Sequence, residues 1–407
     1  MDPRTARIVV VGAGQAGAAL VARLRARGHV GPLTLVGAEP DPPYQRPPLS
    51  KAYLKGEMPR ERLWLRPLSF YEEGNIELVT GARVVAIDRA AKAVVLADGR
   101  RLAYDLLALT TGALPRRLPA AAGGDLDGVF VMRSLADADA LAAVVRPGMP
   151  ALIAGGGYIG LEGAAVLAGK GLSVTLIELA PRILARVAAP ATADFFRALH
   201  RAHGVDIREG VRVTGLTGAA GRVTGVELVD GTRIPAEVVL VGVGITPDTA
   251  LAEAAGLAVE DGILVDAAGR TSDPAIFAAG DCARFPWRGA TLRLESVPNA
   301  IDQGEAVAEA MLGSGEGYVP RPWFWSDQYD VKLQIAGLNT GWERTVTRPG
   351  TREGGQSVWY FAGERLLAVD AMNDPRAYMT AKRWIEAGVS PDPVALADPA
   401  ADLKTLA

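Results

Sequence analysis

The chain has 407 residues, a length that favours two or three hydrophobic cores rather than one. Its 43 basic and 46 acidic residues are well mixed and leave a formal charge of −3, which argues against nucleic acid as a partner. The one cysteine, Cys282, excludes an internal disulfide, a paired redox dithiol and an iron–sulfur cluster held by the chain's own cysteines. Any redox centre must therefore be a bound group.

The N-terminal apolar run is interrupted by glycines and a glutamine between residues 12 and 17, so we expect no signal peptide. The apolar stretch 151–169 contains Glu162 and several glycines, which favours a buried strand–turn–helix over a membrane span. Together with the cysteine usage, these features predict a cytoplasmic protein with no membrane partner.

Two segments share one pattern: a short apolar strand, a glycine-rich turn, a helix and a second strand. In the first segment we expect these elements at residues 7–11, 12–17, 18–27 and 33–36. In the second segment we expect them at residues 151–154, 155–160, 161–170 and 173–177. Both segments are β–α–β units, so the sequence predicts parallel sheets with right-handed crossovers.

The first turn carries the spacing Gly12-x-Gly14-x-x-Gly17. Glycines at these positions permit a tight turn and let the backbone and the helix N-terminus approach a pyrophosphate. Glu39 lies about 20 residues after the last glycine, where a carboxylate can accept hydrogen bonds from ribose hydroxyls. The neighbouring Ala38 leaves the register of this acid open. The segment predicts a dinucleotide-binding site.

The second turn, 155–160, contains Gly155, Gly157 and Gly160 at the same spacing, and Glu178 ends the following strand. A carboxylate there accepts from a free 2′-hydroxyl and repels a 2′-phosphate, which favours NADH over NADPH. Two dinucleotide sites in one chain indicate electron transfer between two dinucleotides.

Antiparallel hairpins are predicted where Asp98-Gly99 separates strands 93–96 and 102–109, and where Asp230-Gly231 separates strands 223–229 and 234–241. Beyond Trp323 the chain becomes tryptophan-rich, with strands expected at 331–335, 357–361 and 366–371 and a helix at 375–387. The predicted fold is α/β, with two Rossmann-like dinucleotide-binding domains and a C-terminal α+β domain. We expect the first dinucleotide-binding domain at 1–112 and 248–322, the second at 113–247 and the C-terminal domain at 323–407.

Several motifs make the sequence resemble the FAD-containing ferredoxin reductases of the putidaredoxin reductase type, which serve bacterial cytochrome P450 and dioxygenase systems. These motifs are Val9–Gly14, Pro43–Lys51, Gly155–Glu162, Ala279–Cys282, Glu295–Ala300 and Trp323–Gln328. The resemblance covers almost the whole chain; residues 46–51 and the tryptophan motif are specific to this type, whereas apoptosis-inducing factor and monodehydroascorbate reductase share much of the rest. It implies the glutathione-reductase-like FAD/NAD fold, with FAD bound by the domain at 1–112 and 248–322 and NAD by the domain at 113–247. It also implies an NADH-dependent flavoprotein that passes electrons through FAD to a transiently bound [2Fe–2S] ferredoxin, which feeds a cytochrome P450 or related oxygenase.

The resemblance also implies which residues form the site. FAD contacts are expected from Gly12, Gly14, Gln15, Ala16, Gly17, Ala38, Glu39, Arg46, Lys51, Val84, Thr111, Gly112, Arg133, Gly280, Asp281 and Val297. NADH contacts are expected from Gly155, Gly157, Tyr158, Ile159, Gly160, Glu178 and Gly244. An ion pair of Lys51 and Glu162 is expected beside the reactive edge of the flavin ring, with Tyr158 covering the ring until nicotinamide displaces it. Trp325 is expected to stack near the ring. Core packing remains an alternative for Tyr158 and Trp325.

Other sequence features bear on the electron acceptor. An acidic ferredoxin would dock on a basic patch, for which the candidates are Arg60, Arg62, Arg66 and Arg293. The histidines His29, His200 and His203 lie in expected helix ends or loops without ligand spacing, so we predict no metal site. Two alternatives stay open: an NADH oxidase or a quinone or monodehydroascorbate reductase, and an NADH-sensing binding protein like apoptosis-inducing factor.

Overall fold

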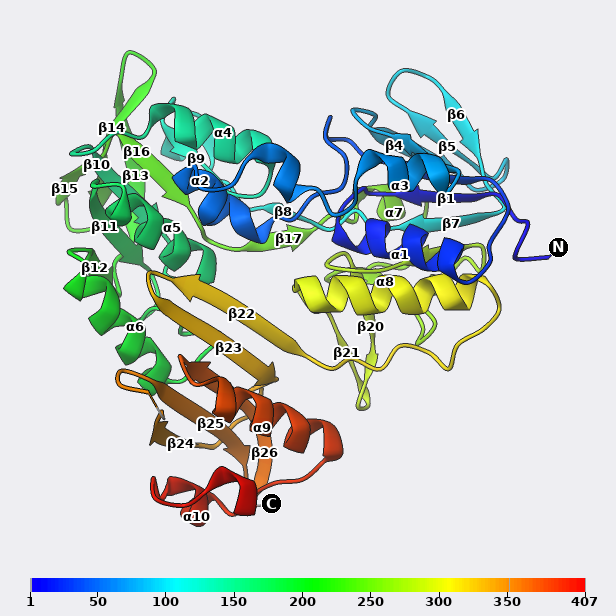
Figure 1. Ribbon diagram of the computed structural model, residues 1–407. Helices are drawn as coiled ribbons and strands as arrows, with labels where there is room; N and C mark the ends of the chain where they lie inside the picture. Colours follow the sequence, from blue (N-terminus) through cyan, green and yellow to red (C-terminus); the bar gives the residue numbers. More distant parts are fainter. Residues whose placement is uncertain (1, 351, 407) are drawn as a thin grey trace. The chain divides into compact units, whose positions relative to one another are not determined.

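A computed structural model describes residues 2–350 and 352–406 of the chain. The chain divides into two compact units, each built from segments distant in sequence (Figure 1). The first unit comprises Met1–Gln45, Arg60–Leu114 and Ile245–Pro322, and the second comprises Arg46–Pro59, Pro115–Gly244 and Trp323–Ala407. Residues 46–59, which the predicted boundaries assigned to the FAD-binding domain, thus pack within the second unit, together with the C-terminal segment.

A parallel sheet forms the centre of the first unit, with the strand order β19-β7-β1-β2-β3. These strands are Ile276–Ala278, Leu106–Leu109, Ile8–Val11, Leu33–Val36 and Ile76–Val79, respectively. β1 is buried on both faces, which explains its uninterrupted sequence IVVV. Helices α1 (Gln15–Ala26) and α8 (Val297–Met311) lie side by side over one face (Figure 1).

The opposite face of this sheet packs against an antiparallel sheet and a short helix. The antiparallel strands are β4 (Val84–Asp88), β5 (Ala93–Leu96) and β6 (Arg101–Ala103), and the helix is α7 (Ala250–Ala254). The unit also contains η2 (Arg60–Leu63), α3 (Leu68–Glu73), β18 (Ile263–Leu264), β20 (Ala283–Trp287) and β21 (Ala290–Leu292). Two further short strands, β8 (Ala113–Pro115) and β17 (Ile245–Pro247), pair with each other.

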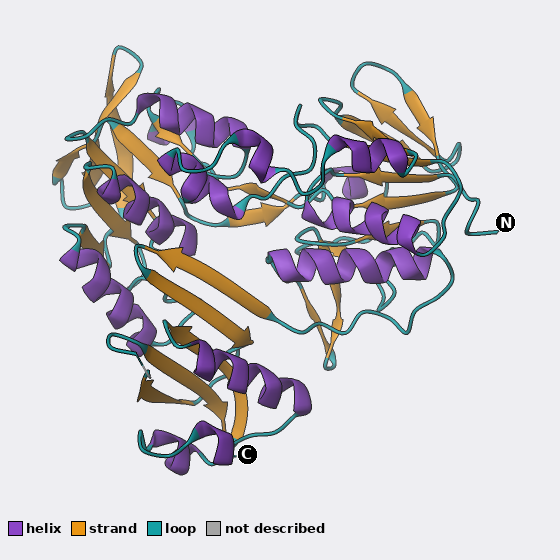
Figure 2. Cartoon of the chain, viewed as in Figure 1, coloured by secondary structure: helices purple, strands orange, loops and turns teal. Residues whose placement is uncertain are grey.

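The second unit repeats the parallel arrangement, in the order β12-β11-β10-β16-β9. These strands are Asp206–Glu209, Ser173–Glu178, Pro150–Ala154, Val238–Val241 and Val129–Phe130. The accompanying helices are η1 (Pro47–Ser50), α2 (Ala52–Lys55), η3 (Ala120–Ala122), α4 (Leu135–Val144), α5 (Tyr158–Gly169) and α6 (Pro190–Ala202). An antiparallel sheet of β13 (Val213–Ala219), β14 (Arg222–Leu228) and β15 (Arg233–Pro235) completes this part of the unit. Figure 2 shows the helices flanking the strands.

The C-terminal segment is an antiparallel sheet with one helix on its outer face. The strand order is β22-β23-β26-β25-β24, which corresponds to Trp323–Gln328, Val331–Gly337, Arg365–Met372, Gln356–Ala362 and Arg344–Pro349. Helix α9 (Pro375–Ala387) packs on one face through Trp384 and Trp359, while Leu333 and Tyr360 on the other face join the core around α5 and α6. The chain ends with α10 (Pro393–Ala397) and η4 (Leu403–Thr405).

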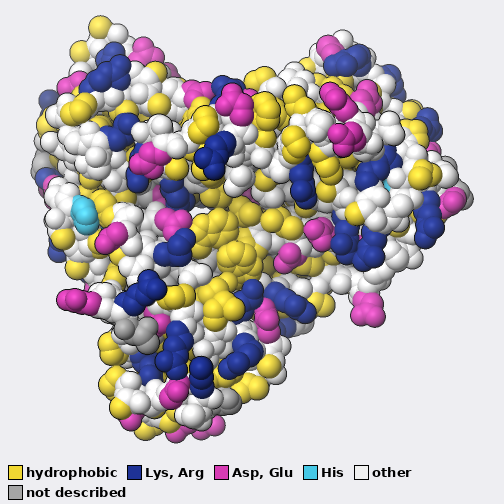
Figure 3. Space-filling view, viewed as in Figure 1, with side chains coloured by type: hydrophobic (Ala, Val, Ile, Leu, Met, Phe, Trp, Pro, Cys, Tyr) yellow, Lys and Arg dark blue, Asp and Glu magenta, His cyan; other side chains and the backbone are white. Residues whose placement is uncertain are grey.

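The predicted fold class is confirmed, and the local expectations differ from the structure in a few places. The predicted strands 102–109 and 234–241 are each divided in two, because the first half completes an antiparallel sheet and the second half enters a parallel one. Strands β22 and β24 were not predicted. No helix among residues 2–350 and 352–406 is long and apolar enough to cross a membrane. Basic and acidic side chains are interspersed over the face seen in Figure 3.

Candidate functional site

The three glycines of the first turn, Gly12, Gly14 and Gly17, differ in the space around a Cβ atom added to each. Gly12 has φ +112°, and a Cβ there would lie 2.1 Å from the carbonyl oxygen of Thr110. A Cβ at Gly17 would lie 2.2 Å from the carbonyl oxygen of Gly12, so this glycine lets α1 approach the turn. At Gly14, by contrast, a Cβ would meet no atom within 4 Å. The open side of Gly14, at the N-terminus of α1, therefore fits a pyrophosphate, and Gln15 and Ala16 form the first helical residues beside it.

The acid expected on the ribose lies just beyond β2. Glu39 is partly exposed, and its carboxylate accepts a hydrogen bond from the hydroxyl of Tyr44. Ala38 is exposed and offers only its backbone for a polar contact. The arrangement orients the Glu39 carboxylate, as a ribose ligand requires.

Residues at the carboxyl ends of β7 and β19 lie near the N-termini of α1 and α8. Thr111 donates from Oγ1 to the carbonyl of Asp248 at 2.6 Å, and Gly112 follows at φ +74°. The amide of Gly280 donates to Gln303 Oε1 at 2.8 Å, and a Cβ there would lie 3.0 Å from Ala16 Cβ. Asp281 follows Gly280 at this edge, where ligands of parallel sheets bind.

Two other expected FAD contacts are Val297, at the start of a helix, and Val84, in the hydrophobic core. Val297 is the first residue of α8, whose N-cap Ser296 accepts from the amide of Asn299 at 3.2 Å. Val84 is the first residue of β4 and is buried in the core beneath the parallel sheet. A contact of Val84 with a ligand would therefore use its backbone rather than its packed side chain.

The second turn repeats the glycine geometry of the first. A Cβ at Gly155 (φ +108°) would lie 2.5 Å from the carbonyl oxygen of Gly242, and one at Gly160 would lie 2.0 Å from that of Gly155. A Cβ at Gly157 would again meet nothing within 4 Å. Ile159 is exposed in the first turn of α5. This turn thus presents a second open backbone and helix N-terminus, which fit a second pyrophosphate.

The carboxylate of Glu178 lies beside that second turn. Oε2 accepts from the amide of Gly156 at 2.7 Å, and Oε1 accepts from the amide of Ala180 at 2.7 Å. Charge-assisted hydrogen bonds of this kind fix the position of the negative charge. Gly244 lies shortly after β16 and has φ +109°. Its carbonyl accepts a hydrogen bond from the amide of Arg116 at 3.0 Å.

Lys51 and Glu162 form a buried ion pair within the second unit. Lys51 Nζ lies 2.6 Å from Glu162 Oε2, and the Glu162 residue is only 3 % exposed. The same oxygen accepts from Ser50 Oγ at 2.8 Å, while Oε1 accepts from Ser326 Oγ at 2.7 Å. Both carboxylate oxygens are therefore satisfied, which a charge in this position requires.

Arg46 and Arg133 also meet in the second unit. Arg46 donates from Nη1 to the carbonyl of Arg133 at 2.7 Å, just before α4. This helix starts with a capping box in which Ser134 and Asp137 bond each other's backbone amides. The cap fixes the chain direction at Arg133 and hence the position of the Arg46 guanidinium.

Tyr158 and Trp325 both have aromatic neighbours. Tyr158 is the first residue of α5, and its ring centroid lies 5.0 Å from that of Phe324. Burial raises the pKa of its phenol well above the usual value, and within the part of the chain that the structure describes its hydroxyl has no hydrogen-bond partner. Trp325 stacks on Trp323, with centroids 5.4 Å apart. Because strand side chains alternate, Trp325 points to the face opposite Phe324 and Ser326.

Sequence reasoning missed several polar residues behind the ion pair. His200 lies in the last turn of α6, as expected of a residue at a helix end, but it is fully buried, with Nε2 2.8 Å from Gln328 Oε1. Ser50, Ser326 and Gln328 had been given no role. Polar residues at alternate positions of an aromatic strand, 326 and 328, were the available indication. Among residues 2–350 and 352–406, no cluster of three or more potential ligands suits a metal ion.

The arginines considered for ferredoxin docking are in unlike surroundings. Arg60 pairs with Asp41 at 2.7 Å, and Arg293, whose side chain is 11 % exposed, pairs with Glu295 at 2.6 Å. Arg62 and Arg66 are exposed, the latter over the ring of Phe70. Buried and neutralised, Arg293 is a poor candidate for steering an acidic partner.

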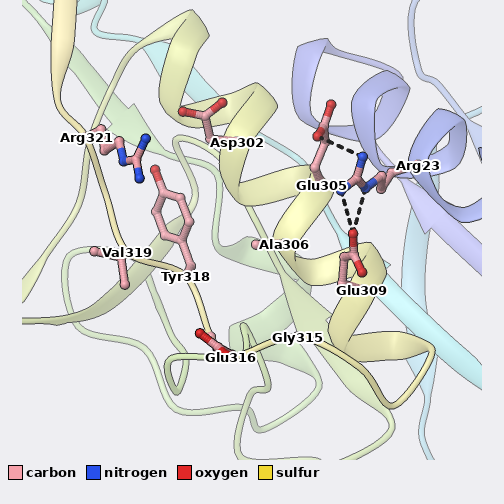
Figure 4. A pocket seen from close by; sticks show the side chains of 11 residues that line it. Arg23, Asp302, Glu305, Ala306, Glu309, Gly315, Glu316, Tyr318, Val319 and Arg321 are labelled. Carbon is pink, nitrogen blue, oxygen red and sulfur yellow. Dashed lines mark hydrogen bonds and ion pairs between the residues drawn. The ribbon is translucent and has the colours of Figure 1, made fainter. Parts of the chain in front are cut away.

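A separate surface pocket of about 450 Å³ lies along α8 (Figure 4). Arg23 of α1 reaches across to Glu309 at 2.6 Å and Glu305 at 3.7 Å, while Tyr318 and Arg321 lie on the far side. None of the expected FAD contacts lines this pocket. It belongs to the packing of α1 on α8 rather than to the cofactor cradle.

Comparisons with known proteins agree with this geometry. Residues 6–304 match the family model described as pyridine nucleotide-disulphide oxidoreductase, and residues 323–407 match one described as reductase C-terminal. The chain is 44 % identical to the ferredoxin–NAD(P)(+) reductase of Sphingomonas sp. over 98 % of this chain and 96 % of that protein. It is 42 % identical to putidaredoxin reductase of Pseudomonas putida, with the same coverage of both chains.

Among solved structures, the crystal structure of the covalent putidaredoxin reductase–putidaredoxin complex matches with a TM-score of 0.95 and 41 % identity, covering 98 % of each chain. The chain belongs to the pyridine nucleotide-disulphide oxidoreductase family. Within that family it is an FAD- and NADH-dependent oxidoreductase of the ferredoxin reductase type.

Proposed function

We propose that the protein passes electrons from NADH through FAD to a [2Fe–2S] ferredoxin that feeds a cytochrome P450 or a related oxygenase. The observation that carries this proposal is the pair of open glycine cradles in a chain whose one cysteine is buried. Two dinucleotides can bind, yet no dithiol is present to receive electrons from them. The similarity to a ferredoxin–NAD(P)(+) reductase and to putidaredoxin reductase supports a protein as acceptor.

The first cradle is assigned to FAD. Gly14 and the N-terminus of α1 would bind the pyrophosphate, Glu39 the ribose, and Asp281 the ribityl chain. The N-terminus of α8, beginning at Val297, would direct its partial positive charge at the flavin. Bound FAD supplies the ability to accept a hydride and to release electrons singly.

The second cradle is assigned to NADH. Gly157 and the N-terminus of α5 would bind its pyrophosphate. Glu178 would accept from a free 2′-hydroxyl, and its fixed negative charge would repel a 2′-phosphate. This is the basis for a preference for NADH over NADPH.

The remaining polar and aromatic residues are assigned to the flavin edge. Lys51, held by Glu162, would present its ammonium to the ring, and Arg46 and Arg133 would complete the FAD contacts. Tyr158 would cover the ring in the absence of nicotinamide, and Trp325 would stack near it. We also propose that residues 1–112 and 248–322 form the FAD-binding domain, 113–247 the NAD-binding domain and 323–407 the C-terminal domain, and that the protein is cytoplasmic.

The acceptor is tested by NADH-driven reduction of cytochrome c, measured with and without a [2Fe–2S] ferredoxin at low and high salt. We expect strong stimulation by ferredoxin, with an association rate that falls as ionic strength rises. Ferricyanide reduction serves as the control for electron transfer into FAD. Rapid ferricyanide reduction without stimulation by several ferredoxins, and with faster turnover of quinone or oxygen, would favour the direct-acceptor alternative.

The docking surface is tested by charge reversal at the exposed arginines. Arg62→Glu with Arg66→Glu should weaken the ferredoxin-dependent rate and leave ferricyanide reduction unchanged. The matched control is Arg212→Glu, which alters an exposed arginine outside the proposed surface. Equal effects of the two sets would remove Arg62 and Arg66 from the proposed interface.

A further inference from the structure

A chain of buried polar side chains extends from the ion pair into α6. Ser326 Oγ donates to Glu162 Oε1 at 2.7 Å, and Gln328 Nε2 donates to Ser326 Oγ at 3.1 Å. Gln328 Oε1 lies 2.8 Å from His200 Nε2. Ser326, Gln328 and His200 are all buried, with at most 1 % of each residue exposed. These contacts connect His200 of α6 to the carboxylate that pairs with Lys51.

The direction of these hydrogen bonds is consistent along the whole chain. Tyr329 Oη lies 3.3 Å from His200 Nδ1, so a neutral imidazole that accepts there carries its proton on Nε2. Nε2 then donates to Gln328 Oε1, the Gln328 amide donates to Ser326, and the Ser326 hydroxyl donates to Glu162. Each donor is thereby oriented toward the carboxylate, and such chains of hydrogen bonds polarise one another.

We propose that Gln328 and His200 are positioning residues of the reaction: by orienting the Ser326 hydroxyl, they fix the Glu162 carboxylate and, through it, the ammonium of Lys51. This inference rests on the proposed function, which places Lys51 beside the flavin. It assigns a role to His200 and Gln328, neither of which belongs to the expected cofactor contacts.

The Lys51 side chain can move into an adjacent pocket if the Glu162 carboxylate turns away from it. Its side chain is 18 % exposed and lines a pocket of about 350 Å³ together with Lys55, Lys170 and Tyr329. An ammonium that loses a fixed partner gains hydration by turning into this pocket. Burial lowers the pKa of His200 to about 4, so the imidazole is neutral at neutral pH and its Nδ1 can accept a hydrogen bond from Tyr329. The hydrogen-bonded chain of His200, Gln328 and Ser326 therefore opposes a rotation of the Lys51 side chain into this pocket.

The experiment compares His200→Leu and Gln328→Leu with the conservative variant His200→Gln, whose amide nitrogen can replace Nε2 as a donor. Purified holoenzyme is measured for the rate of flavin reduction by NADH, the flavin absorption spectrum and the midpoint potential. We expect the Leu variants to slow flavin reduction by about tenfold, an effect of the size that the loss of one buried hydrogen bond produces, with KM for NADH unchanged. The flavin spectrum and the midpoint potential should shift in both Leu variants, and in His200→Gln they should return to the wild-type values.

The control is His203→Phe, which preserves the aromatic stacking of residue 203 on Tyr329 without touching the hydrogen-bonded chain. Leu variants that match this control, or a His200→Gln variant as slow as His200→Leu, would overturn the inference. Lys51→Met separates it from the proposed function: if that variant reduces flavin normally, the placement of the ion pair itself fails. If Lys51→Met is slow and the Leu variants are not, only the positioning role fails.

A second measurement does not depend on the folding of the Leu variants. Nitrogen NMR of the imidazoles in the holoenzyme should show His200 as the Nε2–H tautomer at neutral pH. Glu162→Gln should shift the His200 resonances and leave those of His29 unchanged, because His29 lies in the first unit. An unchanged His200 spectrum would show that the two groups are not coupled and would overturn the inference.

Discussion

The Glu178 carboxylate accepts a hydrogen bond at 2.7 Å from the amide of Gly156, in the turn that opens α5. The other oxygen accepts from Ala180 at the same distance. Both oxygens are held by the backbone, so the position of the negative charge is fixed. The position of this charge, rather than its mere presence in the sequence, makes it suitable for distinguishing the two nicotinamide nucleotides.

Removal of that charge should relax cofactor choice. Glu178→Gln keeps an acceptor and the size of the side chain, and we expect the ratio of kcat/KM for NADPH to that for NADH to rise about tenfold, which corresponds to the loss of about 1.4 kcal/mol of repulsion. Adding Leu179→Arg, at an exposed neighbouring position, should raise the ratio further. Steady-state kinetics with both nucleotides provide the test. A wild-type enzyme that already uses both equally would contradict the role given to Glu178.

Two glycines of the second turn should respond differently to the same substitution. Gly160→Ala places a methyl group 2.0 Å from a backbone oxygen, so we expect a loss of stability of several kcal/mol. Gly157→Ala meets no protein atom within 4 Å, so the free energy of unfolding should stay nearly unchanged while the KM for NADH rises. Chemical unfolding and NADH kinetics separate the two effects. Normal NADH binding by Gly157→Ala would show that the pyrophosphate does not approach this side of the turn.

Acid should destabilise the protein through His200. Its folded-state pKa of about 4 lies below the ordinary value of 6.5, because burial disfavours the imidazolium. Below pH 6.5 the unfolded chain therefore binds a proton that the folded chain refuses, and this destabilisation accumulates until the pH falls through 4. The loss should be on the order of 3 kcal/mol. His200→Gln should remove this part of the pH dependence, whereas His203→Gln should retain it; denaturant unfolding at several pH values will distinguish them.

Asp370 should have the opposite pH dependence. It is fully buried, its Oδ2 accepts from Thr192 at 2.7 Å and from Tyr360, and burial raises its pKa from 3.8 to about 6. The contribution to stability is present below pH 3.8 and is lost as pH rises through 6, at a cost on the order of 3 kcal/mol.

Asp370→Asn should therefore increase the free energy of unfolding at pH 8 and change it little at pH 4. Thr192→Val is the control for disturbing the same contact without removing the charge. An Asp370→Asn variant that is less stable at both pH values would show that the carboxylate is better compensated than its burial implies.

The two nucleotide-binding units were predictable because each depends on local pattern. A buried strand, glycines at fixed spacing and a terminal acid occur within some 30 residues of one another, and the predicted starts and ends of β2 and α9 match the structure. The pairing of Lys51 with Glu162 came from the family resemblance. What supports that pair could not be read in this way, because Ser326, Gln328 and His200 converge from a strand and a helix far apart in sequence.

Local pattern also failed where tertiary structure decides. The proline-rich composition of residues 40–48 favours an extended chain, but Pro47 begins a 3₁₀ turn, since proline suits the first position of a helix. The burial of His200 and its partner could not be predicted, because that partner, Gln328, is supplied by the C-terminal sheet. The division of the predicted strand 102–109 likewise depends on which sheet each half joins.

The complete burial of Cys282 has a practical consequence. Its thiol lies 3.5 Å from the carbonyl of Leu109, and burial raises its pKa, so the folded protein presents no reactive thiolate of its own. A cysteine introduced on the surface will be the single labelling site for a maleimide dye.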